Sequence, residues 1–167
     1  MDIEAHVVIV GGGAGGLELA IRLSEIGAHV MLVDRAPTHL WKPRLHEIAT
    51  GILVEADEEL SYAELAASHG FTFVLGEAKR IDPVERTVTI EALPSHETRI
   101  LPDRIVLPTR RIRYDVIVLA LGSTSNDFGV PGVLDHCFTL DALQGAQDLQ
   151  AALRALAVRV CAGRAER

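Results

Sequence analysis

The run Gly11-Gly-Gly-Ala-Gly-Gly16 is the feature that most restricts how this chain can fold. It follows a short β-branched run, His6 to Val10, which is typical of a buried parallel strand. From Ala14 to Ile26 apolar residues recur at helical spacing, and Gly27 can end that helix. A second apolar run, Ala28 to Val33, comes next. These segments predict a β-α-β unit with a right-handed crossover.

The composition favours an α/β fold. Hydrophobic residues make up 49% of the 167-residue chain but aromatic residues only 4%, so Val, Leu, Ile and Ala must form most of the core. Such a core is typical of helices packed on a parallel sheet. The net charge of −7 argues against nucleic acid as a partner. No apolar run approaches the ~20 residues of a membrane span, so no transmembrane segment is expected.

Gly11, Gly13 and Gly16 form a GxGxxG pattern between the predicted strand and helix. In that setting the first glycine permits a tight turn, the second lets the backbone approach a diphosphate, and the third allows the helix to pack closely. The helix N-terminus adds N–H groups and a partial positive charge. Asp34 follows 34 − 16 = 18 positions later, close to the ~20 expected of the acid that accepts ribose hydroxyls. We therefore expect a bound dinucleotide.

These residues leave both FAD and NAD open as the dinucleotide. The carboxylate of Asp34 would repel a 2′-phosphate, which disfavours NADP. Arg35, next to it in sequence, weakens that argument.

The segment Thr38 to Glu47 is unusually rich in His, Trp, Lys and Arg for a connection. One interpretation is the start of a helix with Pro43 at its first position and His46 on its outer face. The other places Lys42 and Pro43 beside the ring system of a cofactor. The sequence does not decide between them.

From Phe71 onward the pattern changes to short strands. Phe71 to Leu75, a segment through Ile81, and Thr87 to Ile90 predict a small antiparallel β-meander, within about residues 71–108. Leu93 to Pro108 holds three prolines, which indicates an insertion or a long hairpin.

The stretch Arg113 to Gly122 predicts a further buried strand of the parallel sheet that ends in glycine. Its carboxyl end would lie at the crevice where doubly wound sheets bind ligands. Arg110 and Arg111, which precede it, are expected with Arg113 in a solvated turn without a functional role. Farther along, Cys137 to Leu140 predicts a short strand and Ala142 to about Val158 a helix.

Together, these motifs resemble the pyridine-nucleotide:flavin oxidoreductases, a family with two nested dinucleotide folds. The glycine run, Asp34, the meander and the segment from Tyr114 to Gly132 carry the resemblance. Within the family, LWKPRLHEIATG (Leu40 to Gly51) and LGSTSNDFGVPG (Leu121 to Gly132) look like type II NADH:quinone dehydrogenase. The resemblance spans about residues 3–150.

The resemblance implies a Rossmann-like FAD-binding domain in which the first glycine run holds FAD rather than NADH. It implies that Lys42 and Pro43 approach the flavin and that the backbone of Ala78 lies near the adenine. The candidate cofactor-binding residues are accordingly Gly11, Gly13, Ala14, Gly15, Gly16, Asp34, Arg35, Lys42, Pro43, Ala78, Ala120, Leu121 and Gly122. No catalytic residue and no metal ligand is expected, because the flavin itself carries out the bond chemistry.

Residues 1–150 are predicted to be the FAD-binding domain, truncated before the NADH-binding domain, and residues 151–167 a tail unlike the family. Val158 to Val160 could begin the first strand of an NADH-binding fold, but no second glycine fingerprint follows in this sequence. The resemblance implies NADH and a quinone as partners and a homodimer in the full-length form. It implies a cytoplasmic location, with contact to the inner face of the cell membrane only through a C-terminal part that is not in this sequence.

Two functional hypotheses of different class remain. The chain is either an enzyme segment that is catalytically incomplete by itself or a nonredox nucleotide-binding fragment. A sulfide:quinone reductase-like flavoprotein is a further alternative, although Cys137 and Cys161 show no pairing pattern. No cysteine pair follows the second strand, which argues against a disulfide reductase. A short-chain dehydrogenase would need Tyr-x-x-x-Lys, and Ala66 and Val118 stand at the lysine positions.

Overall fold

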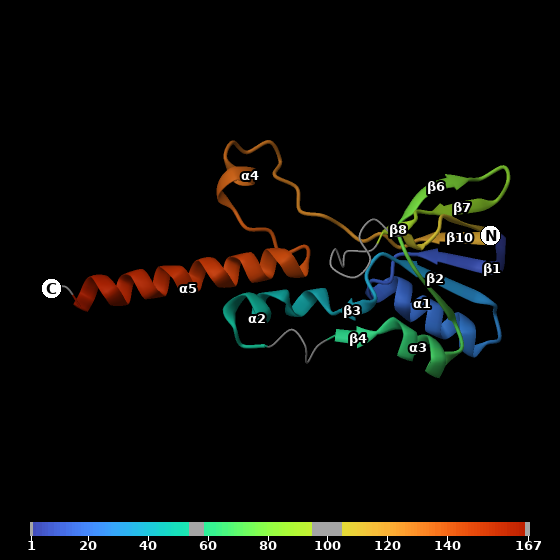
Figure 1. The fold of residues 1–167 in the computed structure, drawn as a ribbon, viewed down its shortest axis with the longest axis horizontal. Helices are drawn as coiled ribbons and strands as arrows, with labels where there is room; N and C mark the ends of the chain where they lie inside the picture. Colours follow the sequence, from blue (N-terminus) through green and yellow to red (C-terminus); the bar gives the residue numbers. More distant parts are fainter. Residues whose placement is uncertain (1, 54–58, 95–104, 166–167) are drawn as a thin grey trace. The chain divides into compact units, whose positions relative to one another are not determined.

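The computed structural model describes residues 2–53, 59–94 and 105–165. The chain divides into two compact units, whose elements are labelled in Figure 1. The first unit comprises residues 1–39 and 60–122, and the second comprises residues 40–59 and 123–167. Each unit is therefore assembled from segments that are distant in sequence.

A six-stranded sheet forms the first unit, in the order β5-β2-β1-β10-β7-β6. The strands are β1 (Asp2–Val10), β2 (Val30–Asp34), β5 (Thr72–Leu75), β6 (Ala78–Asp82), β7 (Thr87–Ile90) and β10 (Arg110–Leu119). The first four in spatial order are parallel, and β7 and β6 continue the sheet antiparallel. Val10 pairs with Val33 on one side and with Leu119 on the other, so three strands end at one edge. The predicted α/β fold and β-α-β unit are confirmed.

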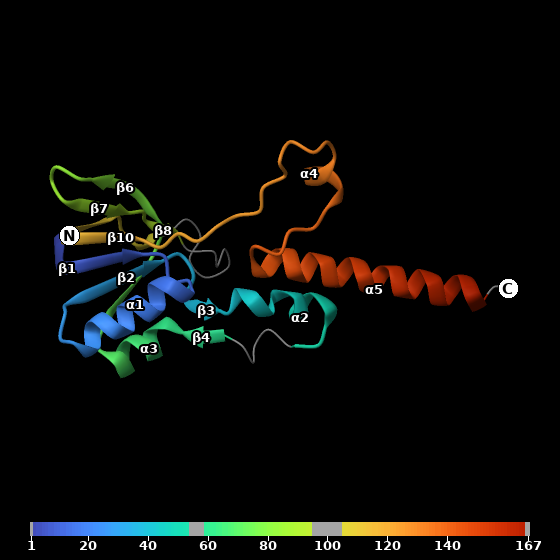
Figure 2. The same cartoon turned by 180° about the vertical axis from the view of Figure 1, so that it is seen from behind.

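Two helices pack on one face of this sheet, as Figure 2 shows from behind. They are α1 (Ala14–Glu25) and α3 (Tyr62–His69). Their apolar side chains form a core with Ile9 and Leu32 of the sheet. The Ser61 hydroxyl caps α3 by accepting the N–H of Glu64, and Gly70 ends it with a φ of 82°. These two residues therefore set the start and the end of α3.

The other face of the sheet has a core of its own. Val8, Met31 and Val33 of the parallel strands are buried there together with Val88 and Ile112. Successive residues of β1 are both inaccessible to solvent, which explains its unbroken apolar run. The prediction of a buried strand over Arg113 to Gly122 is wrong for its second half, because Val116 and Leu119 of β10 are 53% and 56% exposed.

The prediction that Phe71 to Leu75 begins an antiparallel meander is wrong. β5 runs parallel to β2, with Leu32 paired to Phe73 and Asp34 to Leu75. Only β6, β7 and the first part of β10 form an antiparallel element. A short apolar strand carries no local signal of the direction of its partner, so the sequence pattern could not separate the two pairings.

The arginines before the last parallel strand do not lie in a solvated turn. They are part of β10, where Arg110 pairs with Ile90 and Arg113 with Thr87 of β7. Arg110 is half-buried, donates a hydrogen bond to the carbonyl oxygen of Leu75, and has its pKa lowered by desolvation. The alternation of buried Ile112 with exposed arginines is that of a strand with one covered face.

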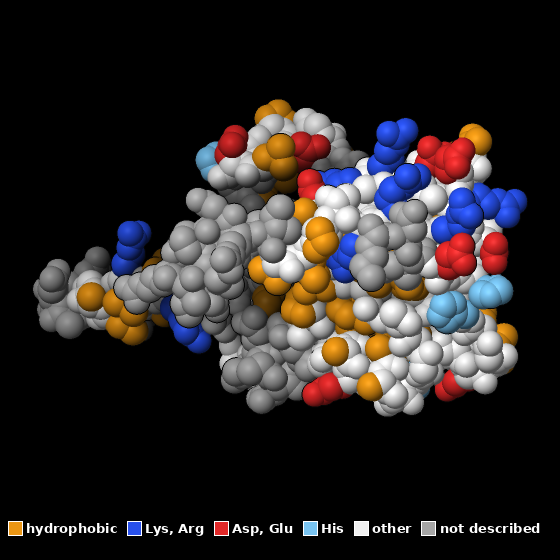
Figure 3. All heavy atoms as spheres, turned by 45° about the vertical axis from the view of Figure 1, so that its right-hand side comes forward, with side chains coloured by type: hydrophobic (Ala, Val, Ile, Leu, Met, Phe, Trp, Pro, Cys, Tyr) orange, Lys and Arg blue, Asp and Glu red, His pale blue; other side chains and the backbone are white. Residues whose placement is uncertain are grey.

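Acidic side chains accompany the basic ones on the surface of the first unit, as the mixed red and blue atoms of Figure 3 show. The ammonium of Lys79 lies 3.1 Å from the carboxylate of Glu77 and 3.3 Å from that of Glu91. These carboxylates raise the pKa of Lys79 through hydrogen bonds and charge.

Two pairs of short strands complete the sheet structure. β3 (Thr38–Leu40) pairs with β4 (Glu59–Ser61), and β8 (Leu93–Pro94) pairs antiparallel with β9 (Ile105–Leu107). The second pair agrees with a long hairpin over the proline-rich segment, whose residues 95–104 lie outside the described part of the chain.

The second unit is helical. It contains a short 3₁₀ turn, η1 (Lys42–Arg44), and the helices α2 (Leu45–Thr50), α4 (Val133–His136) and α5 (Leu143–Ala165). Leu45, Ile48 and Ala49 of α2 pack against Ala146 of α5. The side-chain amide of Gln150 donates a hydrogen bond of 2.8 Å to the Ile48 carbonyl oxygen. The predicted helix is present, but Pro43 lies in η1 and α2 begins two residues later at Leu45, with His46 exposed as expected.

Two strand predictions in this unit are wrong. Residues 137–140 have no strand partner among the described residues and form an extended connection. This connection crosses the first turn of α5 so closely that a Cβ on Gly145 would overlap the carbonyl oxygen of Thr139. Residues 158–160, considered as a possible strand, belong to α5. The predicted boundary at residue 150 also falls within α5, and the proposed domain division stays a prediction.

Candidate functional site: the glycine loop

The glycine loop, residues 11–16, begins where three parallel strands end. The N–H of Gly11 donates to the carbonyl oxygen of Val33 over 2.8 Å, and the N–H of Ala120 donates to that of Val10 over 2.8 Å. Gly11 has a φ of 104°, and a Cβ there would overlap the Ala120 carbonyl oxygen. Both the backbone angle and the lack of room therefore exclude a side chain at position 11, and glycine allows the tight turn there.

Gly16 brings α1 against this turn. A Cβ on Gly16 would overlap the carbonyl oxygen of Gly11 and lie 3.2 Å from the Cβ of Ala120. The close packing expected of the third glycine is thus present, and it joins helix, loop and strand end at one point.

Gly13, Ala14 and Gly15 form the exposed side of the loop. Gly13 is the N-cap of the twelve-residue α1, and a Cβ on Gly13 or Gly15 would meet nothing within 4 Å. The first turn of a helix has N–H groups without intrahelical partners and a partial positive charge, and α1 has no acidic residue there. An open stretch of glycine backbone at a helix N-terminus fits the diphosphate of a dinucleotide.

Asp34 lies at the end of β2 beside this loop and is half-buried. One carboxylate oxygen accepts the N–H of Gly12 at 2.6 Å, and the other accepts the N–H of Ala36 at 2.8 Å. Each oxygen has a second lone pair, so the carboxylate can also accept hydroxyl groups. The spacing of Asp34 predicts only a contact to the sugar, and nothing in the sequence indicates its bond to the loop. The side chain of Arg35 is exposed next to it.

We expect Asp34→Asn to lower the free energy of unfolding by about 1–3 kcal/mol, because one of two backbone N–H groups would then face an amide N–H₂. Urea unfolding followed by circular dichroism measures the change. Asp115→Asn on β10 is the matched control, since the side chain of Asp115 is 65% exposed in a pair with His6. Equal stability of the two variants would contradict the bracing role of Asp34.

The segment around Ala78 reaches the same edge of the sheet. The N–H of Gly76 donates to the carbonyl oxygen of Asp34 over 2.8 Å. Two residues later, Ala78 begins β6 and pairs with Ile90 of β7. The structure therefore brings the backbone before Ala78 to the residue that sequence analysis assigned to the ribose.

The end of β10 supplies the other side of the loop. Ala120 contacts Gly11 and Gly16, whereas Leu121 is 70% exposed and Gly122 has a φ of 72°. The backbone of the predicted strand end lies against the glycine turn, as the sequence analysis expected.

Two functional candidates that the sequence analysis did not identify lie behind the loop. The Tyr62 hydroxyl donates to the carbonyl oxygen of Gly12 at 2.5 Å, and Nδ1 of His39 lies 3.0 Å from the same oxygen. Both side chains are buried, and the ring of Tyr62 stacks on that of Phe73 with centroids 4.9 Å apart. Burial, with a smaller contribution from the charge of Asp34, raises the pKa of Tyr62. No local sequence motif predicts these contacts, because His39 and Tyr62 lie 27 and 50 positions from Gly12.

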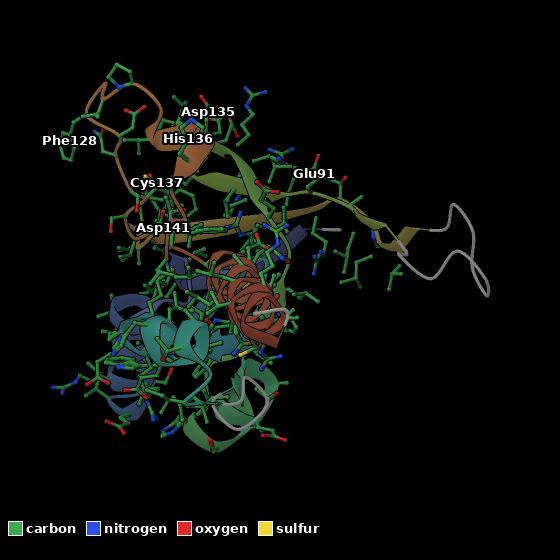
Figure 4. All side chains as sticks on the ribbon, turned by 90° about the vertical axis from the view of Figure 1, so that its left-hand side faces the viewer. Glu91, Phe128, Asp135, His136, Cys137 and Asp141 are labelled. Atoms are coloured by element: carbon green, nitrogen blue, oxygen red, sulfur yellow. The ribbon has the colours of Figure 1, made fainter. Side chains whose placement is uncertain are left out.

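Lys42 and Pro43 belong to the second unit. There the backbone N–H and the hydroxyl of Ser125 donate to the carboxylate of Asp141 over 2.9 and 3.0 Å. These bonds lower the pKa of Asp141, and the charge of Lys42 lowers it further. Figure 4 shows Asp141 just before α5, with Cys137 and Phe128 on the connection that precedes it.

Other kinds of site have little support within the described ranges. No three His, Cys, Asp or Glu side chains gather there in a way that could hold a metal ion. Both cysteines are free and exposed. No helix among the placed residues combines the length and apolarity needed to cross a membrane.

Known proteins are similar to this chain in sequence and in fold. Residues 5–163 match the pyridine nucleotide-disulphide oxidoreductase family. The chain is 44% identical to the type II NADH:quinone oxidoreductase of Haemophilus influenzae, over 96% of this chain and 36% of that protein. It is 32% identical to the type II NADH:quinone oxidoreductase NdhA of Mycobacterium tuberculosis, over 74% of this chain and 24% of that protein.

Solved structures agree with the match. The sulfide:quinone oxidoreductase of Aquifex aeolicus superposes with a TM-score of 0.74 at 25% identity, covering 92% of this chain and 32% of that one. NDH2 of Plasmodium falciparum gives 0.68 at 15% identity, covering 90% and 28%, and so shows the fold alone. The chain covers between 24% and 36% of the length of these relatives. Because the family match extends over nearly the whole chain, the chain belongs to the pyridine nucleotide-disulphide oxidoreductase family.

Proposed function

We propose that this chain is the FAD-binding part of a type II NADH:quinone oxidoreductase. The observation that carries the proposal is the open backbone of Gly13 to Gly15 at the N-terminus of α1, with Asp34 braced beside it. The 44% identity to the H. influenzae enzyme supports the choice within the family. FAD is the cofactor of this family.

The residues of the first unit suit distinct parts of FAD. Gly11, Gly16 and Ala120 shape the turn, and the exposed N–H groups of the loop and first helical turn hold the diphosphate. Asp34 accepts hydroxyls of the adenosine ribose with the lone pairs that Gly12 and Ala36 leave available. FAD held by these residues would supply the redox chemistry, which is uptake of a hydride from NADH and transfer of electrons to a quinone.

The remaining assignments rest on the likeness in sequence. They place Lys42 and Pro43 near the flavin ring, Ala78 near the adenine, and Leu121 and Gly122 at the diphosphate. They make NADH and a quinone the partners, with a homodimer in the full-length form. The location that follows is the cytoplasm, with peripheral contact at the inner face of the cell membrane.

Flavin titration of the purified 167-residue chain tests the proposal. We expect FAD to bind with quenched flavin fluorescence and a perturbed visible absorbance band. We expect no NADH oxidation with a soluble quinone, because the sequence contains one glycine fingerprint and the family uses a second for NADH. Absence of FAD binding would leave a nonredox nucleotide-binding role or none, and would reject the proposal for this chain.

A sulfide:quinone reductase-like function is the second candidate, favoured by the A. aeolicus structure. Such a protein would accept electrons from sulfide rather than NADH. Both cysteines of this chain lie in the second unit and are exposed. Anaerobic bleaching of the FAD-loaded chain by sulfide would favour this candidate, whereas FAD binding without such bleaching would favour the first.

A further inference from the structure

Two buried side chains converge on one backbone carbonyl in the glycine loop. The carbonyl oxygen of Gly12 accepts the Tyr62 hydroxyl at 2.5 Å and lies 3.0 Å from Nδ1 of His39. Since a carbonyl oxygen only accepts hydrogen bonds, this contact places the imidazole proton on Nδ1. His39 belongs to β3, and Tyr62 is the first residue of α3. Neither side chain is required to form the turn of the loop itself.

The orientation of this carbonyl fixes the orientation of the next N–H group. The oxygen of Gly12 and the N–H of Gly13 belong to the same peptide group, and in a planar trans peptide they point in opposite directions. No cis peptide bond occurs in the described chain. Because Gly12 is buried against Tyr62 and His39 whereas Gly13 is exposed, the Gly13 N–H points to the open side of the loop.

The preceding peptide group is held as well. Its N–H, that of Gly12, donates to the carboxylate of Asp34 at 2.6 Å. Both peptide groups that flank the Cα of Gly12 are therefore anchored by side chains. A ligand meets a donor that is already oriented, so binding requires less ordering of the loop.

We propose that Tyr62 and His39 are positioning residues, which hold the Gly12 carbonyl so that the Gly13 N–H is presented to the diphosphate of the cofactor. This inference rests on the proposed FAD binding but concerns the diphosphate group alone. Neither side chain touches the cofactor in this account; both act through the backbone of the loop.

Packing alone does not explain the tyrosine. A phenylalanine would keep the stacking on Phe73, whereas a buried hydroxyl costs free energy unless it finds a hydrogen-bond partner. Burial raises the pKa of Tyr62, so the phenol keeps its proton and stays a donor at all ordinary pH values. The hydroxyl therefore serves the Gly12 carbonyl.

The test compares Tyr62→Phe, His39→Leu and His39→Asn with the unmodified 167-residue chain. Binding of FAD, ADP and adenosine is measured by calorimetry or NMR titration. We expect Tyr62→Phe and His39→Leu to weaken the binding of FAD and of ADP by about 3- to 10-fold, which corresponds to the loss of one hydrogen bond. Adenosine, which lacks the diphosphate, should change by less than about twofold. His39→Asn should recover much of the loss, because the asparagine amide can donate from nearly the position of Nδ1.

A purely structural role gives a different pattern. It would weaken the binding of ADP and of adenosine alike, in proportion to a fall in the free energy of unfolding of the free chain. That result would overturn the inference. Unchanged FAD and ADP binding in Tyr62→Phe would also overturn it while leaving the proposed function intact. Tyr62-dependent binding of ADP without FAD binding would support positioning and reject the FAD proposal. An unmodified chain that binds neither ligand would reject both.

Discussion

Gly16→Ala should destabilise the first unit by about 3 kcal/mol or more, at the upper end of what an overpacked site costs. The added methyl group would overlap the Gly11 carbonyl oxygen on one side and press on the Cβ of Ala120 on the other. Neither neighbour can move easily, because Gly11 and Ala120 are both hydrogen-bonded to adjacent strands. Urea unfolding followed by circular dichroism gives the loss.

Gly15→Ala provides the matched control one residue away. A Cβ there meets nothing within 4 Å, and Gly15 lies in α1. Alanine favours a helix over glycine by ~1 kcal/mol, so this variant should be at least as stable as the unmodified chain. Equal stability of Gly16→Ala and Gly15→Ala would mean that α1 does not pack against the turn as described.

Gly13→Ala should weaken FAD binding by at least about tenfold, because its methyl group would project into the open side of the loop where the diphosphate must approach the backbone. The backbone angles of Gly13, φ −59° and ψ −179°, are accessible to alanine. The free energy of unfolding should fall by no more than ~1 kcal/mol, because alanine is a poorer N-cap residue than glycine. Flavin fluorescence titration and urea unfolding measure the two quantities separately.

Gly163→Ala is the control for Gly13→Ala. It lies near the end of α5 in the second unit, where a Cβ also meets nothing within 4 Å. FAD affinity should be unchanged in that variant. If Gly13→Ala binds FAD as tightly as Gly163→Ala, the diphosphate does not approach the loop at Gly13.

The sequence predicted the elements whose signals are local. An apolar run that ends in glycine identified β1, and helical periodicity identified α1. The structural roles of Gly11 and Gly16 were predicted correctly, because a position without room for a Cβ requires glycine, and glycine is visible in the sequence.

The elements that the sequence missed depend on distant partners. β5 pairs with β2, more than thirty positions earlier, and its direction has no trace in the strand itself. The strand character of the arginines depends on the neighbouring strand β7, whose Val88 pairs with Ile112. Residues 137–140 have the composition of a strand but cross α5 at Gly145, and no strand within the described ranges pairs with them.

The site shows the same division. The glycines and Asp34 could be found because they occur at characteristic spacing along the chain. His39 and Tyr62 could not, because they meet only in the folded molecule at a backbone oxygen, and a backbone oxygen has no sequence identity.

The bond between Asp34 and Gly12 also limits how this protein can be re-engineered. Designers who wish to change a dinucleotide site to accept a phosphorylated ribose usually exchange the acid at the end of the second strand for a neutral or basic residue. In this chain that exchange would release the Gly12 N–H and remove one anchor of the loop, which we propose holds the diphosphate. A change of nucleotide preference here therefore requires a compensating acceptor for the loop, introduced together with the new side chain.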